Sequence, residues 1–578
     1  MKKTIALLLT AALLLTLLSG CGASEKQPDS KPVPSPSAAA EETVPAISFL
    51  ADALPEPDLP ERPDGVHADV DYDDMHWELY DMTAFNAWAA RLASGQAEAE
   101  EAERIIDWLS AEYTRLQTYS ELAWIDFYAG NDPDGTVSES CRALDEMLTQ
   151  ASDTLRSAVS SALDSDAGTE LTDYLGEEAA RDLADYEDMT EREAALWNRE
   201  TELVLEYNSF IERTDLSLAA LNKRAGKVFL ELVSVRNELA ELQGYDSYAD
   251  YAYEQIYARD YTPEDAAALC EKIKPYAREY FADCYYSGAF SRDVGTFSAG
   301  ELMDLLRTFA PRISLKAAQA LQYMEDHDLY MLESGRIISQ LGYTTTLPLY
   351  NAPFLYNALY ENYYDVSGVF HEFGHYYDAY INPEPEDWES AGSYDVFEIH
   401  STSMEALLYG WYDEIFGAEA DTARIFCLDG LIDNVISGCI YDEFLQKVYS
   451  TPDLTVGRVN KLFRDVAASY GKEFYAPGSA YEWMYVSHNF ESPFYYISYA
   501  VSVLASLQIW ALAQRDRQAA IDLYNDLVSR GAYTESYCEL VRAVGLKLFT
   551  EDLEGCIGDA WEELHRLCLA FEAKEQAA

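Results

Sequence analysis

Basic residues are scarce in this chain of 578 residues, which holds 40 lysines and arginines against 102 aspartates and glutamates. The formal net charge at pH 7 is therefore −62. A surface of this sign repels phosphate groups, so nucleic acids are excluded as partners. The ordinary consequence of so much acid is solubility, which we favour, and the alternative is the attraction of cationic peptides into an acidic cleft.

Cysteine is also used sparingly, and none of its nine positions belongs to a Cys-x-x-Cys pair. Because cysteine zinc sites are commonly built from such pairs, we expect no site of that kind. Eight of the cysteines are scattered over residues 141–568. The hydrophobic fraction of 49% allows a core large enough to need no disulfides, although disulfides would be permitted outside the cytoplasm. We predict buried free thiols at these eight positions.

Long apolar runs are missing after the first twenty residues, so we expect no later segment to span a bilayer. The chain starts with Met1-Lys2-Lys3 and an apolar run from Ile5 to Leu18, which is short for a membrane span and typical of a signal peptide over residues 1–20. The run Leu18-Ser19-Gly20-Cys21 resembles a bacterial lipobox, which implies cleavage before Cys21 and a lipid on its sulfur. The alternative is a plain secretory signal. Both interpretations place the mature protein outside the cytoplasm.

Proline-rich sequence follows this leader. Residues 21–65 contain Lys31-Pro32-Val33-Pro34-Ser35-Pro36 and Leu54-Pro55-Glu56-Pro57, and prolines at this density keep a chain extended. We predict a tether that holds a globular protein away from a membrane surface. From Asp71 to about Tyr330 the periodicity is helical, and the apolar stripes of these helices are expected to form a core.

Histidine occurs only eight times, yet two histidines lie in the run Phe370-His371-Glu372-Phe373-Gly374-His375-Tyr376. On a helix, His371 and His375 are one turn apart and point the same way, so they can hold one metal ion. Glu372 lies about 100° further round the helix, where it can reach a water on that metal. The pattern His-Glu-x-x-His is typical of zinc hydrolases. The alternative is an amphipathic helix whose two histidines form hydrogen bonds within a core.

A third protein ligand is expected on a second helix, predicted over residues 395–408. Glu398 and Glu405 lie seven residues apart, hence on one face of that helix. The turn-rich residues 382–387 allow the second helix to return against the first. We predict Glu398 on the metal, and spacing alone leaves His400 open as an alternative. Glu405 or Asp365 would accept hydrogen bonds from the histidine N–H groups.

These motifs resemble the thimet oligopeptidase and oligoendopeptidase F family of zinc peptidases. The resemblance is carried by Phe370–His375 with Glu398–Glu405, by Tyr343–Tyr350 with Ala352-Pro353-Phe354, and by His488–Tyr499. It is specific over about residues 343–510. In the family the third ligand is a glutamate on the helix after the metal helix, and Glu398 matches that position.

The resemblance also implies a fold and a cofactor. The expected fold is mainly α, a large two-lobed helical zincin (neurolysin-like) with a deep central channel and a small β element before the metal helix. We assign residues 66–335 to an N-terminal helical lobe and residues 336–578 to a catalytic zinc-binding lobe. One Zn²⁺ per chain is expected. The channel would restrict substrates to short unstructured peptides.

A β-prone segment over residues 337–350 precedes the metal motif, with Gly342 and Pro348 as its interruptions. By its residues alone it is equally consistent with a structural hairpin and with an exposed edge that a peptide backbone pairs with. The family resemblance favours the edge.

A further candidate patch spans residues 483–499 and contains His488, Tyr495, Tyr496 and Tyr499. Phenol and imidazole groups can stabilise an oxyanion, although tyrosines in a chain with 44 of them commonly serve in packing. The family carries a histidine followed by tyrosines here, which implies catalytic roles for His488 and Tyr499. A further family tyrosine, two helical turns before the one that matches Tyr499, is Ser492 in this chain. Either the loop is shifted here or another phenol takes that part, and Tyr496 is assigned for the second case.

Together these features predict a zinc-dependent oligopeptidase that hydrolyses internal bonds of short unstructured peptides, with water on the zinc activated by Glu372. We expect a monomer, lipid-anchored on the outer side of a bacterial cell membrane. Three alternatives remain open: exopeptidase action at the same site, a non-catalytic peptide-binding surface lipoprotein, and an acidic helical scaffold that binds no metal.

Overall fold

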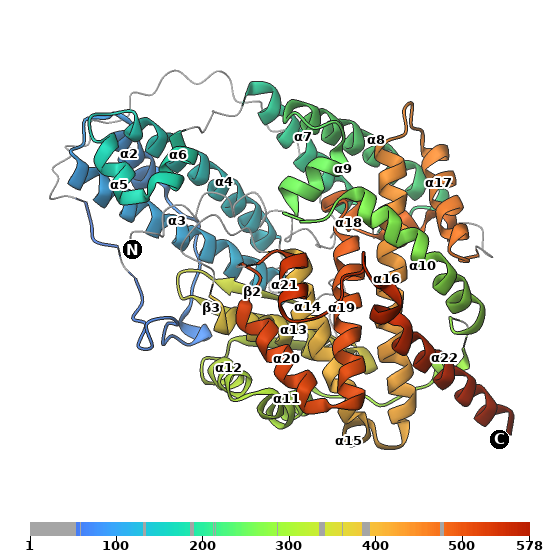
Figure 1. Cartoon of the computed structure of the whole chain (residues 1–578). Coiled ribbons are helices and arrows are strands. Elements are labelled where there is room, and N and C mark those ends of the chain that lie inside the picture. The colour runs from blue at the N-terminus through green and yellow to red at the C-terminus, as the bar shows by residue number, and fades with distance from the viewer. Residues whose placement is uncertain are drawn as a thin grey trace.

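The computed structural model describes residues 54–577, apart from 58, 131–134, 185–189, 212, 214, 286, 335–341, 361, 384–392, 474–478 and 534. In this part of the chain the architecture is mainly helical with one small sheet, as the sequence predicts (Figure 1). The predicted signal peptide, Cys21 and most of the predicted tether lie outside the described residues.

The first helices form a group at one end of the molecule (Figure 1). They are α2 (Met82–Ala93), α3 (Ala99–Tyr128), α4 (Thr136–Leu163), α5 (Gly168–Leu175) and α6 (Glu177–Ala184), preceded by the 3-10 turn η3 (Tyr72–Asp74). Helix α3 packs along α4 and places Ile105, Ile106 and Leu109 out of contact with solvent. Its last turn meets the sheet, where the hydroxyl of Tyr356 donates to the carbonyl of Tyr128 over 2.9 Å.

A second helical group packs against the C-terminal half of the chain. It consists of α7 (Glu191–Asn208), α8 (Leu218–Leu242), α9 (Tyr248–Tyr251) and the π-helix η4 (Ala252–Ile256). Arg236 of α8 is fully buried and joins this group to two later helices. Its guanidinium donates to Glu200 over 2.6 Å, to the hydroxyl of Tyr449 over 3.3 Å, and to the carbonyl of Phe490.

Three further helices lead to the sheet: α10 (Pro263–Asp283), α11 (Ala299–Ile313) and α12 (Leu315–Asp326), with the 3-10 turn η5 (Gly288–Ser291) between the first two. Capping boxes at Thr262 and Ser298 begin α10 and α11, as their sequences indicate. Helix α10 packs on α16, and α12 packs on α13. The helices that precede residue 335 therefore share contacts with the lobe predicted to follow it.

The sheet has three strands, β1 (Tyr330–Ser334), β2 (Gly342–Leu347) and β3 (Ala352–Leu359), in the order β1-β3-β2. Strand β1 runs parallel to β3, while β2 is antiparallel to it, with Tyr343 opposite Tyr356. Every residue of β3 is buried. The β-prone segment predicted before the metal motif contains strand β2, which lies at one edge of the sheet.

The remaining helices build the body that holds the candidate site (Figure 1). They are α13 (Tyr363–Ile381), α14 (Tyr394–Leu408), α15 (Tyr412–Phe416), α16 (Ala420–Tyr449), α17 (Val456–Ser469), α18 (His488–Glu491), α19 (Tyr496–Arg515), α20 (Arg517–Arg530), α21 (Tyr537–Ala543) and α22 (Leu553–Ala577). Short 3-10 turns occur at η6 (Tyr409–Trp411), η7 (Gly417–Glu419) and η8 (Ser479–Tyr485).

Helix α19 lies at the centre of this body, where it contacts α14, α16 and α20. It corrects one sequence expectation, because an 18-residue window within its 20 residues reaches a mean hydropathy of 1.5, so the helix is long and apolar enough to cross a bilayer. In the described part of the chain it is the one helix with this property. However, 67% of the apolar window is buried, which is the behaviour of a core helix.

All eight cysteines after Cys21 are buried free thiols, as predicted. Burial raises the pKa of the Cys427 thiol to about 12, so this group stays protonated at neutral pH.

Two glycines of α16 give a matched test of how tightly α16 and α19 pack. A Cβ on Gly438 would lie 2.6 Å from the carbonyl oxygen of Tyr496 and 2.8 Å from the Cβ of Ala500, whereas a Cβ on Gly430 would meet nothing within 4 Å. We predict that Gly438→Ala destabilises the protein by about 1–3 kcal/mol through overpacking. Gly430→Ala should stabilise it by about 0.5–1 kcal/mol, because alanine favours helix. Thermal unfolding of both variants measures the contrast, and equal shifts would contradict it.

Candidate metal centre

The helix that carries the metal motif, α13, has a strongly capped N-terminus. Asn362 accepts a hydrogen bond from the Tyr364 N–H over 2.8 Å. Asp365 accepts from the Tyr360 N–H over 2.6 Å through one oxygen and from the Asn362 N–H over 3.1 Å through the other. The prediction that Asp365 receives a hydrogen bond from a histidine ligand is therefore wrong. Its carboxylate is fully buried and satisfies backbone donors that the helix start leaves unpaired.

Three side chains converge between α13 and α14. One ligand atom from each of His371, His375 and Glu398 lies within 4.8 Å of the other two. The Nε2 atoms of His371 and His375 are 3.5 Å and 4.0 Å from Oε2 of Glu398. Atoms that share a tetrahedral zinc at about 2.0–2.2 Å are separated by about 3.3–3.6 Å, so the His371 contact fits such a site directly and the His375 contact is slightly longer. Two histidines with one glutamate form a common catalytic zinc donor set. Among the described residues no other cluster meets the same criterion.

Gly374 allows α13 and α14 to approach closely enough for this arrangement. A Cβ at this position would lie 2.7 Å from the Cα of Ser401 and 2.9 Å from the carbonyl oxygen of His400, both in α14. Because Gly374 immediately precedes His375, the close contact occurs beside a candidate metal ligand. His400, the alternative ligand, instead places Nδ1 3.0 Å from Oδ2 of Asp378 in a fully buried pair.

The orientation of His371 is fixed from α14. Its Nδ1 lies 2.8 Å from Oε1 of Glu405, and the hydroxyl of Ser367 donates to the other oxygen of that carboxylate. A carboxylate on Nδ1 holds the proton there and leaves Nε2 as the metal-binding nitrogen. The structure thus brings Glu405 to the position that the sequence predicts for it, on a histidine ligand.

Glu372 lies on the same helix and faces the sheet. The hydroxyl of Thr344 in β2 donates to the Glu372 carbonyl over 2.9 Å and to Oε2 over 3.1 Å. Burial raises the pKa of Glu372 to about 7, while the charge of His371 and the Thr344 hydrogen bond oppose that rise. A carboxylate with a pKa near neutrality is suited to accept and return a proton.

A residue that sequence reasoning left out of the site is Tyr495. Its hydroxyl donates to Oε1 of Glu398 over 2.9 Å, and Ser401 donates to Oε2 over 3.3 Å. Burial raises the pKa of Glu398, and the charge of His371 lowers it. Tyr495 was visible in the sequence only as one member of a tyrosine cluster. No local pattern separates it from the neighbouring tyrosines, because the Glu398 carboxylate that it contacts is 97 residues away.

The other predicted aromatic residues gather around Tyr495. The His488 ring centroid lies 5.1 Å from those of Tyr495 and Tyr496 and 6.2 Å from that of Tyr499. Burial lowers the pKa of His488 to about 4, so the imidazole is neutral at pH 7. Tyr496 also packs against Tyr441, with ring centroids 5.1 Å apart. The cluster is joined to the metal triad, which consists of His371, His375 and Glu398, through the Tyr495–Glu398 hydrogen bond. The catalytic roles of His488, Tyr496 and Tyr499 stay predictions.

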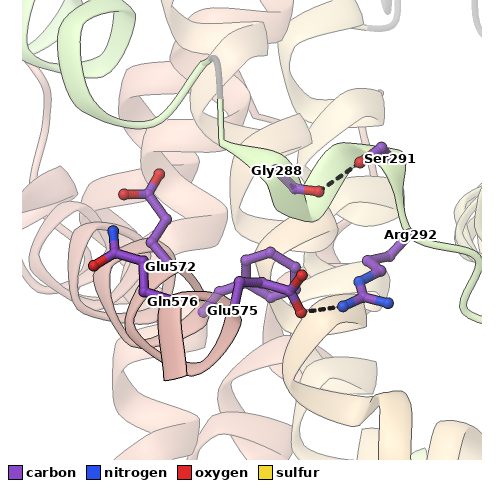
Figure 2. A pocket seen from close by; sticks show the side chains of 7 residues that line it. Gly288, Ser291, Arg292, Glu572, Glu575 and Gln576 are labelled. Carbon is purple, nitrogen blue, oxygen red and sulfur yellow. Dashed lines mark hydrogen bonds and ion pairs between the residues drawn. The ribbon is translucent and has the colours of Figure 1, made fainter. Parts of the chain in front are cut away.

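Two surface cavities lie away from these residues. The larger has a volume of about 430 Å³ and lies between η5 and the last turns of α22. Figure 2 shows the ion pair of Arg292 with Glu575 across it. The smaller, about 240 Å³, is lined by residues that include His67, Lys316 and Tyr380. Neither contains a residue of the metal triad.

Comparison with solved structures identifies the fold. PZ peptidase A, solved with an inhibitor, superposes with a TM-score of 0.67 at 18% identity, covering 86% of this chain and 99% of the other. A Bacillus anthracis protein assigned as an oligoendopeptidase F gives a TM-score of 0.63 at 21% identity, covering 87% and 98%. The chain has the oligoendopeptidase F fold.

This oligoendopeptidase F fold is the two-lobed helical architecture that the sequence motifs led us to expect. A carboxypeptidase from Pyrococcus furiosus is also similar, with a TM-score of 0.53 at 11% identity over 84% of this chain and 100% of the other. No protein-family model matches the sequence, and no curated protein sequence matches it.

The contact between Glu405 and His371 predicts a loss of metal affinity when the carboxylate is removed. Glu405→Gln should weaken binding of a divalent cation by about 10- to 100-fold, because it removes the charge that orients and polarises the imidazole. Competition with a chromophoric chelator measures the affinity. Glu563→Gln on α22 is the control, since its carboxylate pairs with Arg566 at the surface. Equal affinities of the Glu405 and Glu563 variants would contradict the role given to Glu405.

Proposed function

We propose that this protein is a zinc-dependent oligopeptidase that hydrolyses internal bonds of short unstructured peptides. The observation that carries the proposal is the convergence of His371, His375 and Glu398, with Glu372 beside the first histidine. That convergence occurs in a chain with the oligoendopeptidase F fold. The helical scaffold and the non-catalytic binding protein give no reason for a buried base beside such a group.

The donor set fits a zinc ion. His371, His375 and Glu398 would hold it, and a zinc ion supplies Lewis acidity that polarises a carbonyl and acidifies water. The Glu405 carboxylate at 2.8 Å from Nδ1 of His371 supports this assignment, because such partners are typical of histidines that bind metals.

The protein groups around this centre divide the chemistry of hydrolysis among them. Glu372 takes a proton from the attacking water and delivers it to the nitrogen of the leaving amine. Thr344 holds the Glu372 carboxylate through its 3.1 Å hydrogen bond. His488 and Tyr499, within the aromatic cluster around Tyr495, donate hydrogen bonds to the oxyanion that develops on the peptide carbonyl.

Strand β2 supports a peptide as the substrate. It is an edge strand whose Thr344 contacts Glu372, so a peptide backbone that pairs with this edge would lie beside the base. Short unstructured peptides can adopt the extended conformation that such pairing needs. A deep channel between the lobes would exclude folded proteins, and we include it in the proposal.

Exopeptidase action is the second candidate, and the similarity to the Pyrococcus furiosus carboxypeptidase favours it. The two activities use the same chemistry and differ in whether the substrate needs a free end. A peptide blocked at both ends therefore separates them.

We also propose that the protein acts outside the cytoplasm as a monomer anchored to a bacterial cell membrane by a lipid on Cys21. The support is the basic start, the apolar run and the lipobox-like Leu18–Cys21, followed by the proline-rich tether.

The proposed base predicts a separation of metal binding from turnover. Glu372→Gln should retain one zinc per chain and lose about 10²- to 10⁴-fold in kcat, because the amide cannot accept the proton. The assay uses an internally quenched peptide blocked at both ends, with zinc content measured by atomic emission. His375→Ala should lose the metal. Parental activity in Glu372→Gln would contradict the mechanism. A parent that cleaves only peptides with a free end would replace the endopeptidase proposal with the exopeptidase one.

The proposed anchor predicts a change of location when Cys21 is replaced. Cys21→Ser removes the thiol that would carry the lipid, so the protein should leave the membrane fraction. Fractionation of cells that express the parent and the variant measures this change. A parent found in the cytoplasm would refute the localisation.

A further inference from the structure

A buried arginine from the N-terminal half of the chain reaches two segments of the candidate site. Arg259 lies shortly after the end of the π-helix η4. The preceding residue, Ala258, adopts a φ of +46°, and the Arg259 N–H donates to the Tyr253 carbonyl over 2.9 Å. The side chain is completely shielded from solvent. Its Nη2 donates to the Phe494 carbonyl over 2.9 Å and to the hydroxyl of Ser498 over 2.8 Å.

The same guanidinium also faces the helix that carries Glu398. Its Nε lies 3.6 Å from Oδ1 of Asp395, whose side chain is 2% exposed. Asp395 is in the first turn of α14, three residues before Glu398. A buried charge needs a partner of opposite sign, so this ion pair links the start of α14 to Arg259 by electrostatic attraction. The guanidinium also lies over the rings of Tyr253 and Tyr257, at 4.4 Å and 4.5 Å from their centroids.

The segment held by Arg259 has an unusual backbone. Phe494 adopts a φ of +72°, a left-handed conformation that bulky residues adopt only when their surroundings impose it. The carbonyl of Pro493 accepts from the Tyr257 hydroxyl over 2.9 Å, and the carbonyl of Phe494 accepts from Arg259. The next residue is Tyr495, whose hydroxyl donates to Glu398. The direction of Tyr495 therefore depends on a turn whose carbonyls are held from the N-terminal half.

We propose that Arg259 is a positioning residue of the metal centre. It holds the Phe494 turn and the first turn of α14 in one arrangement, so that the Tyr495 hydroxyl stays on Oε1 of Glu398. The proposal rests on the proposed function, because it takes Glu398 as a metal ligand. A lysine could keep one of these contacts but has no planar fork to make them together.

The test measures metal binding by the full-length protein rather than peptide cleavage. Arg259→Lys should weaken binding of Zn²⁺ and Co²⁺ by about tenfold, the lower end of the effect of disturbing a group that orients a ligand. It should also change the visible absorption of the Co²⁺-loaded protein in the way that Tyr495→Phe does. Because both changes act through the same hydrogen bond, the double variant should bind Co²⁺ no more weakly than the weaker single variant.

Arg236→Lys is the matched control. The Arg236 side chain is equally buried and donates to the Phe490 carbonyl of the same segment, and it also donates to Glu200 and Tyr449, which lie outside α14. The Arg236→Lys variant should have a lower melting temperature, as Arg259→Lys should, but its Co²⁺ spectrum should be unchanged. Tyr257→Phe removes the hydrogen bond to the Pro493 carbonyl and replaces Arg259→Lys as the test if that variant does not fold. It should change the Co²⁺ affinity and the Co²⁺ spectrum in the same direction as Arg259→Lys, by a smaller amount.

Parental affinity and spectrum in Arg259→Lys, or in Tyr257→Phe if that variant replaces it, would overturn the proposal. Losses of affinity that add in the double variant would also overturn it, because the arginine would then act independently of Tyr495. A parent protein that binds neither Zn²⁺ nor Co²⁺ would instead contradict the proposed function, so the two failures are distinguishable.

Discussion

The close contact between α13 and α14 is the constraint on which the candidate site depends. At Gly374 the two backbones approach within a distance that any side chain would prevent, since a Cβ would lie 2.7 Å from the Cα of Ser401. This approach brings Glu398 to both histidines, and all three residues lie within helices and not on loops. A helix pair packed to this tolerance cannot adjust freely, because protein interiors are close-packed. The arrangement of the three candidate ligands therefore depends on helix packing, and a change in that packing would change their separations.

Each reactive group in this centre is oriented by a different part of the chain. Glu405 of α14 orients His371, Thr344 of β2 holds Glu372, and Tyr495 before α19 holds Glu398. The three contacts come from a helix, a strand and a turn that meet only in the folded protein. Groups that are already oriented need little reorganisation during the reaction, and this lowers the activation free energy in an electrostatic active site. The site is thus built by convergence of elements and not by one local motif.

Helical spacing in the sequence predicted the candidate ligands, while the errors have both local and distant causes. His371, Glu372 and His375 form a pattern of helical period, and Glu398 with Glu405 repeats it one helix later, so these residues could be placed from the sequence. Asp365 was misassigned because a carboxylate three residues after Asn362 also fits a capping box. In the structure the Asp365 carboxylate caps the start of α13. Tyr495 could not be singled out because its partner is 97 residues away. The apolar character of α19 was underestimated because its serines and single charged end interrupt the run without removing its hydropathy.

The long chain separations across the site have a consequence for biosynthesis. The Phe494 carbonyl meets Arg259 across 235 residues, and contacts at such separation form late because closing the intervening loop costs conformational entropy. A chain still emerging from the ribosome therefore contains the metal motif before it contains the turn that completes it. On the proposed function, the hydrolytic centre is complete only after residues 494 and 495 have been synthesised and have packed against Arg259 and Glu398.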